Sequence, residues 1–306
     1  MYPKILTILA IFVIQFHVNA QNTPSFLPTN GLVGWWPFTG NAFDSSMNGN
    51  NGVVSGATLT NDRFGNTNAA YSFDGLNNRI EILDAASLRC KKITLSAWVF
   101  NKNIIKIGQI IYKGSLVANG EAYSLSSVDQ RINTGVKIGS NCVANVGWKG
   151  VQGKQPMVQG AWEHYVATYD GTIYKIYRNG VLDTSKAIAG LMDECVGGNL
   201  RFGFDHTLYS NSTGDGFNGF IDDIGIWNRA LDQMEITQLY TAVYACGEGN
   251  VGVNICEPQR NLHVKDVMRL EPRNTSPSNP GKGDIYFDGI TNKLRVYNGT
   301  EWKDCW

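Results

Sequence analysis

The segment DSSMNGNNG collects side chains that could bind a metal cation. Asp44, Asn48 and Asn50 offer one carboxylate and two amides within a loop that contains glycine. Oxygen atoms of these types are the ligands that calcium prefers. The spacing differs from that of the EF-hand, which requires D-x-[DN]-x-[DN]-G followed by a glutamate. Two interpretations stay open, a calcium loop of another kind or a solvated turn.

A second acid lies in the apolar run GFIDDIGIW. In a strand, Asp222 shares a face with Phe220. Asp223 then shares the opposite face with Ile221, because successive side chains alternate. Whichever face packs into the core, one carboxylate is buried, and burial without compensation costs several kcal/mol. A cation, an arginine such as Arg201, or backbone N–H donors must supply that compensation.

The residues that could support catalysis are few. Retaining glycoside hydrolysis needs two carboxyl groups about 5–5.5 Å apart, whereas the adjacent Asp222 and Asp223 are expected on opposite faces. His164 lies within WEHYVATYD, where alternation predicts a packed side chain. No G-x-S-x-G or HExxH motif is present. The sequence therefore predicts a non-catalytic protein, with a glycoside hydrolase as an alternative.

Candidate ligand-binding residues lie outside the clearest strands. Sugar-binding proteins stack aromatic rings on sugar faces and add amides and acids. Trp148 in NVGWKGVQGK offers such a ring, and the long segment 205–218 contains Tyr209, Asn211 and Asp215. Binding residues are often carried on loops of this kind. Alternatively, Trp148 covers the sheet and the loop residues belong to a solvated turn.

These residues must be positioned by strands, because the chain reads as one strand after another from residue 31 to 228. Alternation or β-branched and aromatic enrichment marks the segments 79–83, 93–100, 109–114, 162–170, 173–180, 199–204 and 219–227. Asp170-Gly171 and Asn179-Gly180 are tight-turn dipeptides. Many strands at short spacing predict an all-β fold, a two-sheet antiparallel sandwich.

One helix is predicted at about residues 232–244. Asp232 and Glu235 form a D-x-x-E capping box, and Leu231 with Ile236 fits a hydrophobic staple. An apolar stripe follows at helical spacing, so the helix is expected to pack on the sandwich.

The adjacent Trp35 and Trp36 cannot form one flat platform, because alternation sends their rings to opposite faces. We expect one ring in the core and the other packed under a loop or the helix.

The last 61 residues, 246–306, differ in composition from the rest of the chain. Residues 271–283 are rich in Pro, Asn, Ser and Gly and read as a linker. In the following hairpin, Ile285 and Phe287 are expected to face Leu294 and Val296. Because an isolated hairpin is marginal in water, this tail needs the main domain, a disulfide or further copies of itself.

The 306-residue chain has equal numbers of acidic and basic residues, which gives no electrostatic reason to expect nucleic acid or an anionic membrane as partner. Residues 1–20 read as a secretory signal peptide: a lysine, an apolar run too short to span a bilayer comfortably, and Val-Asn-Ala before Gln21. We expect a secreted or surface-associated protein without membrane insertion.

Six cysteines in an exported chain allow up to three disulfides and fifteen pairings. We predict a Cys142–Cys195 bridge within the main domain and one bridge that ties down the tail.

The order of motifs resembles a known family. GLVGWWPFTGNAFDSSMNGNNG, AAYSFDGLNNRIEI, ITLSAWVF, WEHYVATYDGTIYKIYRNG and GFNGFIDDIGIWNRALDQMEITQLY are similar to the laminin G-like, concanavalin A-like jelly-roll modules of secreted bacterial proteins. The resemblance covers about residues 31–242. It implies a jelly roll that binds carbohydrate or protein, with a structural calcium ion near Asp222. The tail is similar to repeats of phage tail-fibre-like proteins, which suggests attachment or self-association.

The sequence thus predicts a laminin G-like domain over 21–245 and a β-hairpin module over 246–306. We expect a binding or adhesion protein that recognises a glycan or cell-surface protein. The alternative is an assembly protein that forms homo-oligomers through its tail.

Overall fold

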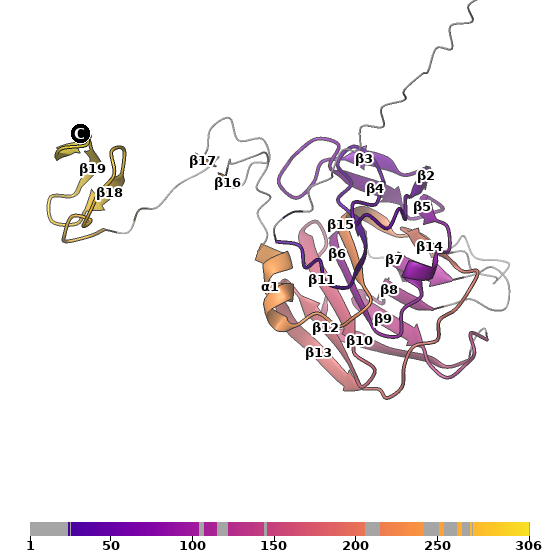
Figure 1. The fold of residues 1–306 in the computed structure, drawn as a ribbon. Coiled ribbons are helices and arrows are strands. Elements are labelled where there is room, and N and C mark those ends of the chain that lie inside the picture. Colours follow the sequence, from indigo (N-terminus) through magenta and orange to yellow (C-terminus); the bar gives the residue numbers. More distant parts are fainter. Residues whose placement is uncertain are drawn as a thin grey trace, which may run out of the picture. The chain divides into compact units, whose positions relative to one another are not determined.

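The computed structural model describes residues 24, 26–103, 107–114, 122–143, 146–205, 215–241, 251–253, 262–264, 270 and 272–305. The chain divides into two compact units, Met1–Ala242 and Val243–Trp306. Figure 1 shows the strands of the first unit stacked as two sheets.

The first unit is an antiparallel sandwich, as predicted. The eight-stranded sheet contains β1 (Leu32–Trp36), β3 (Thr58–Thr60), β4 (Ala70–Asp74), β6 (Ile93–Asn101), β11 (Trp162–Tyr169), β12 (Ile173–Arg178), β13 (Val181–Ala187) and β15 (Asn218–Trp227). Its order is β13-β12-β11-β6-β15-β4-β3, and β1 also pairs with β15.

The facing sheet has seven strands in the order β10-β9-β8-β7-β14-β5-β2. Their bounds are β2 (Val53–Ser55), β5 (Arg79–Ile82), β7 (Ile107–Gly114), β8 (Tyr123–Val128), β9 (Arg131–Lys137), β10 (Trp148–Pro156) and β14 (Asn199–Phe202). A short 3₁₀ helix, Ala86–Leu88, follows β5. Alternation explains which residues enter the core: in β9, Ile132 and Val136 belong to the buried cluster between the sheets, and Asn133 and Gly135 point the other way.

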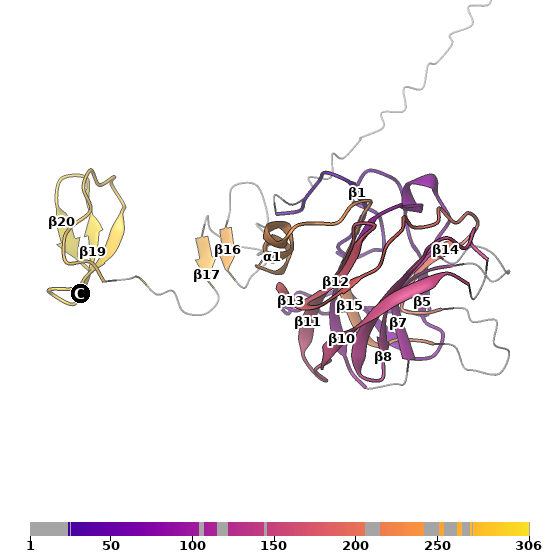
Figure 2. The same cartoon turned by 90° about the horizontal axis from the view of Figure 1, so that it is seen from below.

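The helix α1 (Gln233–Thr241) begins at the predicted capping box. The N–H of Glu235 donates to Asp232 Oδ1, and the N–H of Asp232 donates to Glu235 Oε2, both at 2.9 Å. The predicted residues 242–244 lie outside the described part of the chain. The helix packs beside the eight-stranded sheet, not between the sheets (Figure 1 and Figure 2).

The tryptophan pair is divided as predicted. Trp36 is fully buried between the sheets. Trp35 lies on the opposite face, in a second apolar cluster with Ile236 and Leu239 of α1. Both rings therefore serve the scaffold, and neither is a binding platform.

The second unit contains two small sheets. Strands β16 (Val251–Val253) and β17 (Leu262–Val264) pair in parallel. Strands β18 (Ile285–Asp288), β19 (Lys293–Tyr297) and β20 (Trp302–Asp304) form an antiparallel sheet. The predicted hairpin is therefore part of a sheet with one strand more, β20, and β16 and β17 were not predicted. The predicted pairs Ile285–Val296 and Phe287–Leu294 are confirmed.

The segment predicted as a linker bonds to this small sheet. The N–H of Arg273 donates to the carbonyl of Phe287 at 3.0 Å, and the N–H of Gly283 donates to that of Tyr297 at 2.8 Å. The Ser276 and Tyr286 hydroxyls also lie 3.0 Å apart. The described residues 272–283 are therefore part of the module.

The predicted bridge between Cys142 and Cys195 is present. Of the four cysteines in the described part of the chain, Cys90 and Cys305 carry free thiols. The other two cysteines lie outside the described residues, as does the predicted signal peptide. No helix in the described part of the chain is long and apolar enough to cross a membrane.

Candidate functional site on the outer face of the seven-stranded sheet

The predicted ligand residue Trp148 begins β10, which lies at one edge of the seven-stranded sheet. Its indole lies directly over Gly135 of the neighbouring strand, where an added Cβ would come within 2.6 Å of the indole Nε1. Glycine at this position therefore lets the ring lie flat on the sheet. Trp148 as a whole keeps 38% of its surface exposed. The indole thus packs on the backbone of β9, and part of Trp148 stays in contact with solvent.

Polar side chains continue from Trp148 across the same outer face. Gln109, Ser126 and Asn133 are direct cross-strand partners on β7, β8 and β9. Their amide and hydroxyl groups can donate to and accept from sugar hydroxyls. Gln109 is buried, and its Oε1 has no hydrogen-bond partner among the described residues. Gln109 and Ser126 are buried and Asn133 is half-buried, so this row of two amides and one hydroxyl gives the outer face an uncharged polar character.

A second row lies one pleat further along the strands. Tyr112, Ser124 and Gly135 are cross-strand partners, so the Trp148 ring covers one end of this row. Ser124 and Ser126 are small and buried, and in this sheet they lie between the strands that carry Tyr112 and Trp148. We define the binding face as Gln109, Tyr112, Ser124, Ser126, Asn133, Gly135 and Trp148.

The charged groups at the edge of the binding face are engaged within the protein. Arg201 Nη2 lies 2.8 Å from Glu81 Oε1, and Arg201 Nη1 donates to the carbonyl of Gly114 at 3.3 Å. Hydrogen bonds from Asn199 and Arg201, with the charge of Arg201, lower the pKa of Glu81 although its partial burial opposes this. The pair therefore stays ionised and compensated at neutral pH.

The other predicted ligand residues are placed differently. Tyr209 and Asn211 lie outside the described residues. Asp215 is half-buried, and burial raises the pKa of its carboxyl group. Its backbone carbonyl accepts from the N–H of Gln109 at 2.9 Å, so Asp215 adjoins the binding face.

The Asp44 loop is held by hydrogen bonds within the protein. Asp44 Oδ1 accepts from the N–H groups of Trp35 at 3.0 Å and Ser46 at 2.8 Å, and Oδ2 accepts from that of Asn50 at 2.9 Å. The Asn48 amide donates to the carbonyl of Leu32. These hydrogen bonds attach the loop to β1.

Asn50 adds further hydrogen bonds between the loop and the rest of the domain. Its amide nitrogen donates to the carbonyl of Val33 at 2.7 Å and to the Ser87 hydroxyl at 3.2 Å. Hydrogen bonds within the protein therefore account for the positions of Asp44 and Asn50. In the described part of the chain, no group of three or more His, Cys, Asp or Glu side chains could hold a metal ion.

The compensation for Asp222 is an arginine, but not the predicted one. Arg63 Nη1 lies 3.0 Å from Asp222 Oδ2 and 2.7 Å from Asp223 Oδ2. Arg201 instead pairs with Glu81. The Asp223 N–H also donates to Asp222 Oδ1 at 2.8 Å. Arginine and a backbone donor therefore supply the compensation for which a cation was also considered.

The expectation that Asp222 and Asp223 point to opposite faces is wrong. Strand β15 pairs with β4 up to Ile221 and with β1 from Ile224, and its register with β6 shifts between Asp222 and Gly225. Asp223 adopts a φ of 48°, in the left-handed region. This bulge turns both carboxylates toward Arg63.

A buried Ser–His pair is the nearest resemblance to a catalytic group in the described residues. Ser96 Oγ lies 2.8 Å from His164 Nε2, and both side chains are buried. Burial lowers the pKa of His164 to about 3, and the charge of Arg63 adds to the effect. Trp98 stacks on the imidazole. The pair lacks the access and basicity that a nucleophilic mechanism requires, so its position fits the predicted packed role.

Sequence reasoning missed most of the binding face, namely Gln109, Tyr112, Ser124, Ser126 and Asn133. The signal was present in YSLSSV and RINTGVK, where polar and apolar residues alternate with few exceptions, such as Ser127 and Thr134. Such a pattern indicates a polar outer face. Only the sheet order shows that the polar positions of three strands meet beside Trp148.

The comparisons with known proteins agree on the fold. The family model of the concanavalin A-like lectin/glucanase superfamily matches residues 73–237. No curated protein sequence matches the chain significantly.

Among solved structures, domain 4 of an extracellular GH43 arabinanase from Geobacillus stearothermophilus, in complex with arabinotriose, is 19% identical, with a TM-score of 0.50. That match covers 69% of this chain and 98% of the arabinanase domain.

The receptor-binding domains of botulinum neurotoxins are also similar. The serotype D domain is 16% identical over 69% of this chain and 52% of its own length, with a TM-score of 0.50. A serotype D ligand-binding domain solved with N-acetylneuraminic acid gives 16% identity and a TM-score of 0.51, over 69% and 51% of the two chains. This chain therefore spans about half the length of the toxin domains. At such identities the similarity shows the fold, and with the family model and the two-sheet sandwich it confirms the resemblance inferred from the motifs: the chain belongs to the concanavalin A-like lectin/glucanase superfamily.

Proposed function

We propose that this chain is a secreted, non-catalytic binding protein that recognises a glycan through the binding face. The observation that carries the proposal is Trp148, whose indole lies against Gly135 on the outer face while the residue keeps 38% of its surface exposed. A sugar ring presents an apolar face to such an indole while its hydroxyls reach the Gln109–Ser126–Asn133 row. The arabinotriose and N-acetylneuraminic acid complexes of similar folds support a glycan over a surface protein. The disulfide supports export, because disulfides persist in oxidising compartments.

We expect Trp148→Ala to weaken glycan binding about 30-fold, because a central tryptophan commonly contributes 2 kcal/mol or more to an interface. A glycan array of the mature protein identifies the ligand, and calorimetric titration then compares the variants. Trp162→Ala is the matched control, since Trp162 is a half-buried tryptophan on the outer face of the other sheet. Equal affinities of wild type and Trp148→Ala would contradict the proposal, and release of reducing sugar from a bound polysaccharide would support a hydrolase instead.

A second candidate function, assembly through the tail, is favoured by one observation. Ile285, Phe287, Leu294 and Val296 share one face of the small sheet, and none of the four is buried. The opposite face holds Tyr286, which is buried against Trp302. So small a sheet needs a further apolar layer for independent stability. We propose that a second copy of the chain supplies it.

Light scattering tests this assembly. We expect residues 21–306 to form a dimer or larger oligomer and residues 21–245 to be monomeric. Ile285→Asp should dissociate the full-length oligomer, whereas Ile290→Asp should not, because Ile290 is 70% exposed in the turn between β18 and β19. A monomeric full-length protein, or equal effects of the two variants, would exclude tail-driven assembly.

A further inference from the structure

The loop between β9 and β10 presents an apolar ridge beside the binding face. Val143 and Val146 expose 46% and 53% of their surface, and Trp148 follows at the start of β10. Exposed apolar side chains on a loop are ordinary when they occur singly. Here three of them lie within six residues, and the N–H of Val146 donates to the carbonyl of Val143 at 3.4 Å. Two sets of contacts within the protein hold the described part of this loop.

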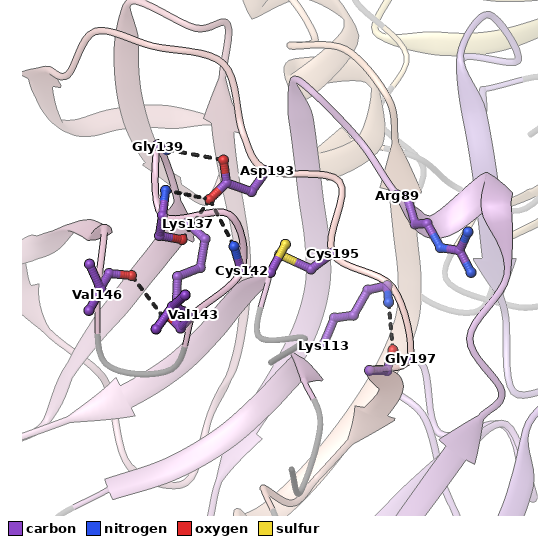
Figure 3. The surroundings of a disulfide bond; sticks show 12 residues. Arg89, Lys113, Lys137, Gly139, Cys142, Val143, Val146, Asp193, Cys195 and Gly197 are labelled. Atoms are coloured by element: carbon purple, nitrogen blue, oxygen red, sulfur yellow. Dashed lines mark hydrogen bonds between the residues drawn. A yellow bond between two sulfur atoms is a disulfide. The ribbon is translucent and has the colours of Figure 1, made fainter. Parts of the chain in front are cut away.

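The first brace is the Cys142–Cys195 disulfide together with Asp193 (Figure 3). Asp193 Oδ1 accepts from the N–H of Gly139 at 3.0 Å. Its Oδ2 accepts from the N–H and the hydroxyl of Ser140, at 2.9 and 2.6 Å. These hydrogen bonds lower the pKa of Asp193 against a contribution from partial burial that raises it. One carboxylate and one disulfide therefore hold the first half of the loop.

The second brace is Lys137, whose side chain is completely buried. Its Nζ donates to the carbonyls of Val143 at 2.8 Å and Val146 at 2.9 Å, so one ammonium group joins the two apolar positions (Figure 3). Lys137 is also the cross-strand partner of Trp148, and its Nζ lies 5.9 Å from the indole centroid. The same side chain therefore fixes the loop and contacts the ring.

Gly147 closes the loop against its beginning. Its φ is 73°, and an added Cβ would lie 2.5 Å from the Ser140 Cβ. The N–H of Ile138 donates to the Gly147 carbonyl at 2.9 Å. The two halves thus meet just before Trp148.

We propose that the Cys142–Cys195 disulfide and Lys137 are positioning elements that pre-organise Val143, Val146 and Trp148 as one ligand-contacting ridge. This inference rests on the proposed function, because the ligand is the glycan bound at Trp148. A rigid ridge contacts the apolar face of a sugar without first losing loop entropy, and such pre-organisation strengthens binding. A disulfide with only a structural role would affect unfolding and leave the affinity alone.

The test compares the double variant Cys142→Ser/Cys195→Ser with wild type. We expect the dissociation constant for the array-selected glycan to rise about tenfold, mostly through faster dissociation. Hydrogen exchange at the Gly139 and Ser140 amides should accelerate, and the melting temperature should also fall. Cys305→Ser is the matched control, because Cys305 is an exposed free thiol in the other unit. A dissociation constant within about twofold of wild type, together with faster exchange, would overturn the inference.

A second variant covers the case in which the double variant does not fold. Lys137→Met keeps the disulfide and the aliphatic stem but removes the donors to the Val143 and Val146 carbonyls. Lys137→Met should also raise the dissociation constant for the glycan. An unchanged dissociation constant would again overturn the inference. If wild type binds no glycan, the proposed function fails and the inference fails with it. If wild type binds and both variants bind equally well, only the inference fails.

Discussion

Arg63→Met should destabilise the sandwich by about 3–5 kcal/mol, which corresponds to a fall of roughly 10 °C in melting temperature for a domain of this size. Arg63 is the counter-ion of both Asp222 and Asp223, and the three side chains expose only 5%, 2% and 3% of their surface. Removing one partner from such a cluster leaves carboxylates in a site where water cannot replace the arginine. Differential scanning calorimetry measures the effect.

The guanidinium of Arg63 has a second role that methionine cannot replace. Its Cζ lies 4.4 Å from the ring centroids of Trp98 and Phe64. Trp98 in turn stacks on His164 and on Tyr240 of α1. The arginine therefore joins the bulge in β15 to the aromatic layer under the helix.

The loss should depend on pH. Burial, followed by the charge of Asp223, raises the pKa of Asp222 well above its ordinary value even though Arg63 opposes the shift. A group whose folded pKa is raised contributes stability that is present below its unfolded pKa and is lost as pH rises through the folded pKa. Without Arg63 the carboxyl groups titrate higher still. The penalty of Arg63→Met should therefore be smaller at pH 5 than at pH 8.

Two variants separate the lost charge from other effects. Arg63→Met/Asp222→Asn should recover part of the stability, since only one buried carboxylate then lacks a partner. Arg131→Met is the matched control, because Arg131 is exposed, and it should change stability by less than about 0.5 kcal/mol. Equal losses at pH 5 and pH 8 would show that the carboxylates are not responsible.

The part of this structure that sequence reasoning predicts is the part in which alternation and burial agree. Strand β6 shows it well: Leu95, Ala97 and Val99 pack between the sheets. The edge strand β10 is harder to predict, because most of its residues are exposed and only Val151 and Gly153 are buried. Trp148 at the start of β10 could be singled out as a candidate ligand residue because it is aromatic. The polar residues near it on β7, β8 and β9 were not singled out.

Two features needed the pairing of distant strands. The binding face depends on β7, β8 and β9 lying side by side with Gln109, Ser126 and Asn133 in register. The bulge depends on β15 changing partners from β4 to β1, which rotates Asp223 toward Arg63. Arg63 itself lies 160 residues from Asp223 in the chain. No local pattern connects them, so the sequence named a wrong arginine.

Asp44→Ala should cost about 3 kcal/mol, although the side chain lies in a polar loop. Its carboxylate accepts from three backbone N–H groups, those of Trp35, Ser46 and Asn50, and Asp44 itself is buried. A buried donor that loses its acceptor costs about 1–3 kcal/mol, and water that enters the exposed side of the loop can satisfy only part of the set. Thermal unfolding measures the loss.

A graded series shows whether hydrogen bonds or a cation give Asp44 its importance. Asp44→Asn keeps an acceptor for Trp35 and Ser46 but turns an amide NH₂ toward the N–H of Asn50, so its loss should be intermediate. Asp74→Ala should cost much less, because the Asp74 carboxylate is exposed and accepts only the N–H of Leu76 in the described contacts. If the hydrogen bonds carry the effect, EDTA should change the wild-type melting temperature by less than about 1 °C. A calcium-dependent rise of several degrees, abolished in Asp44→Ala, would instead restore the calcium loop, because a ligand that binds only the folded state stabilises it by mass action.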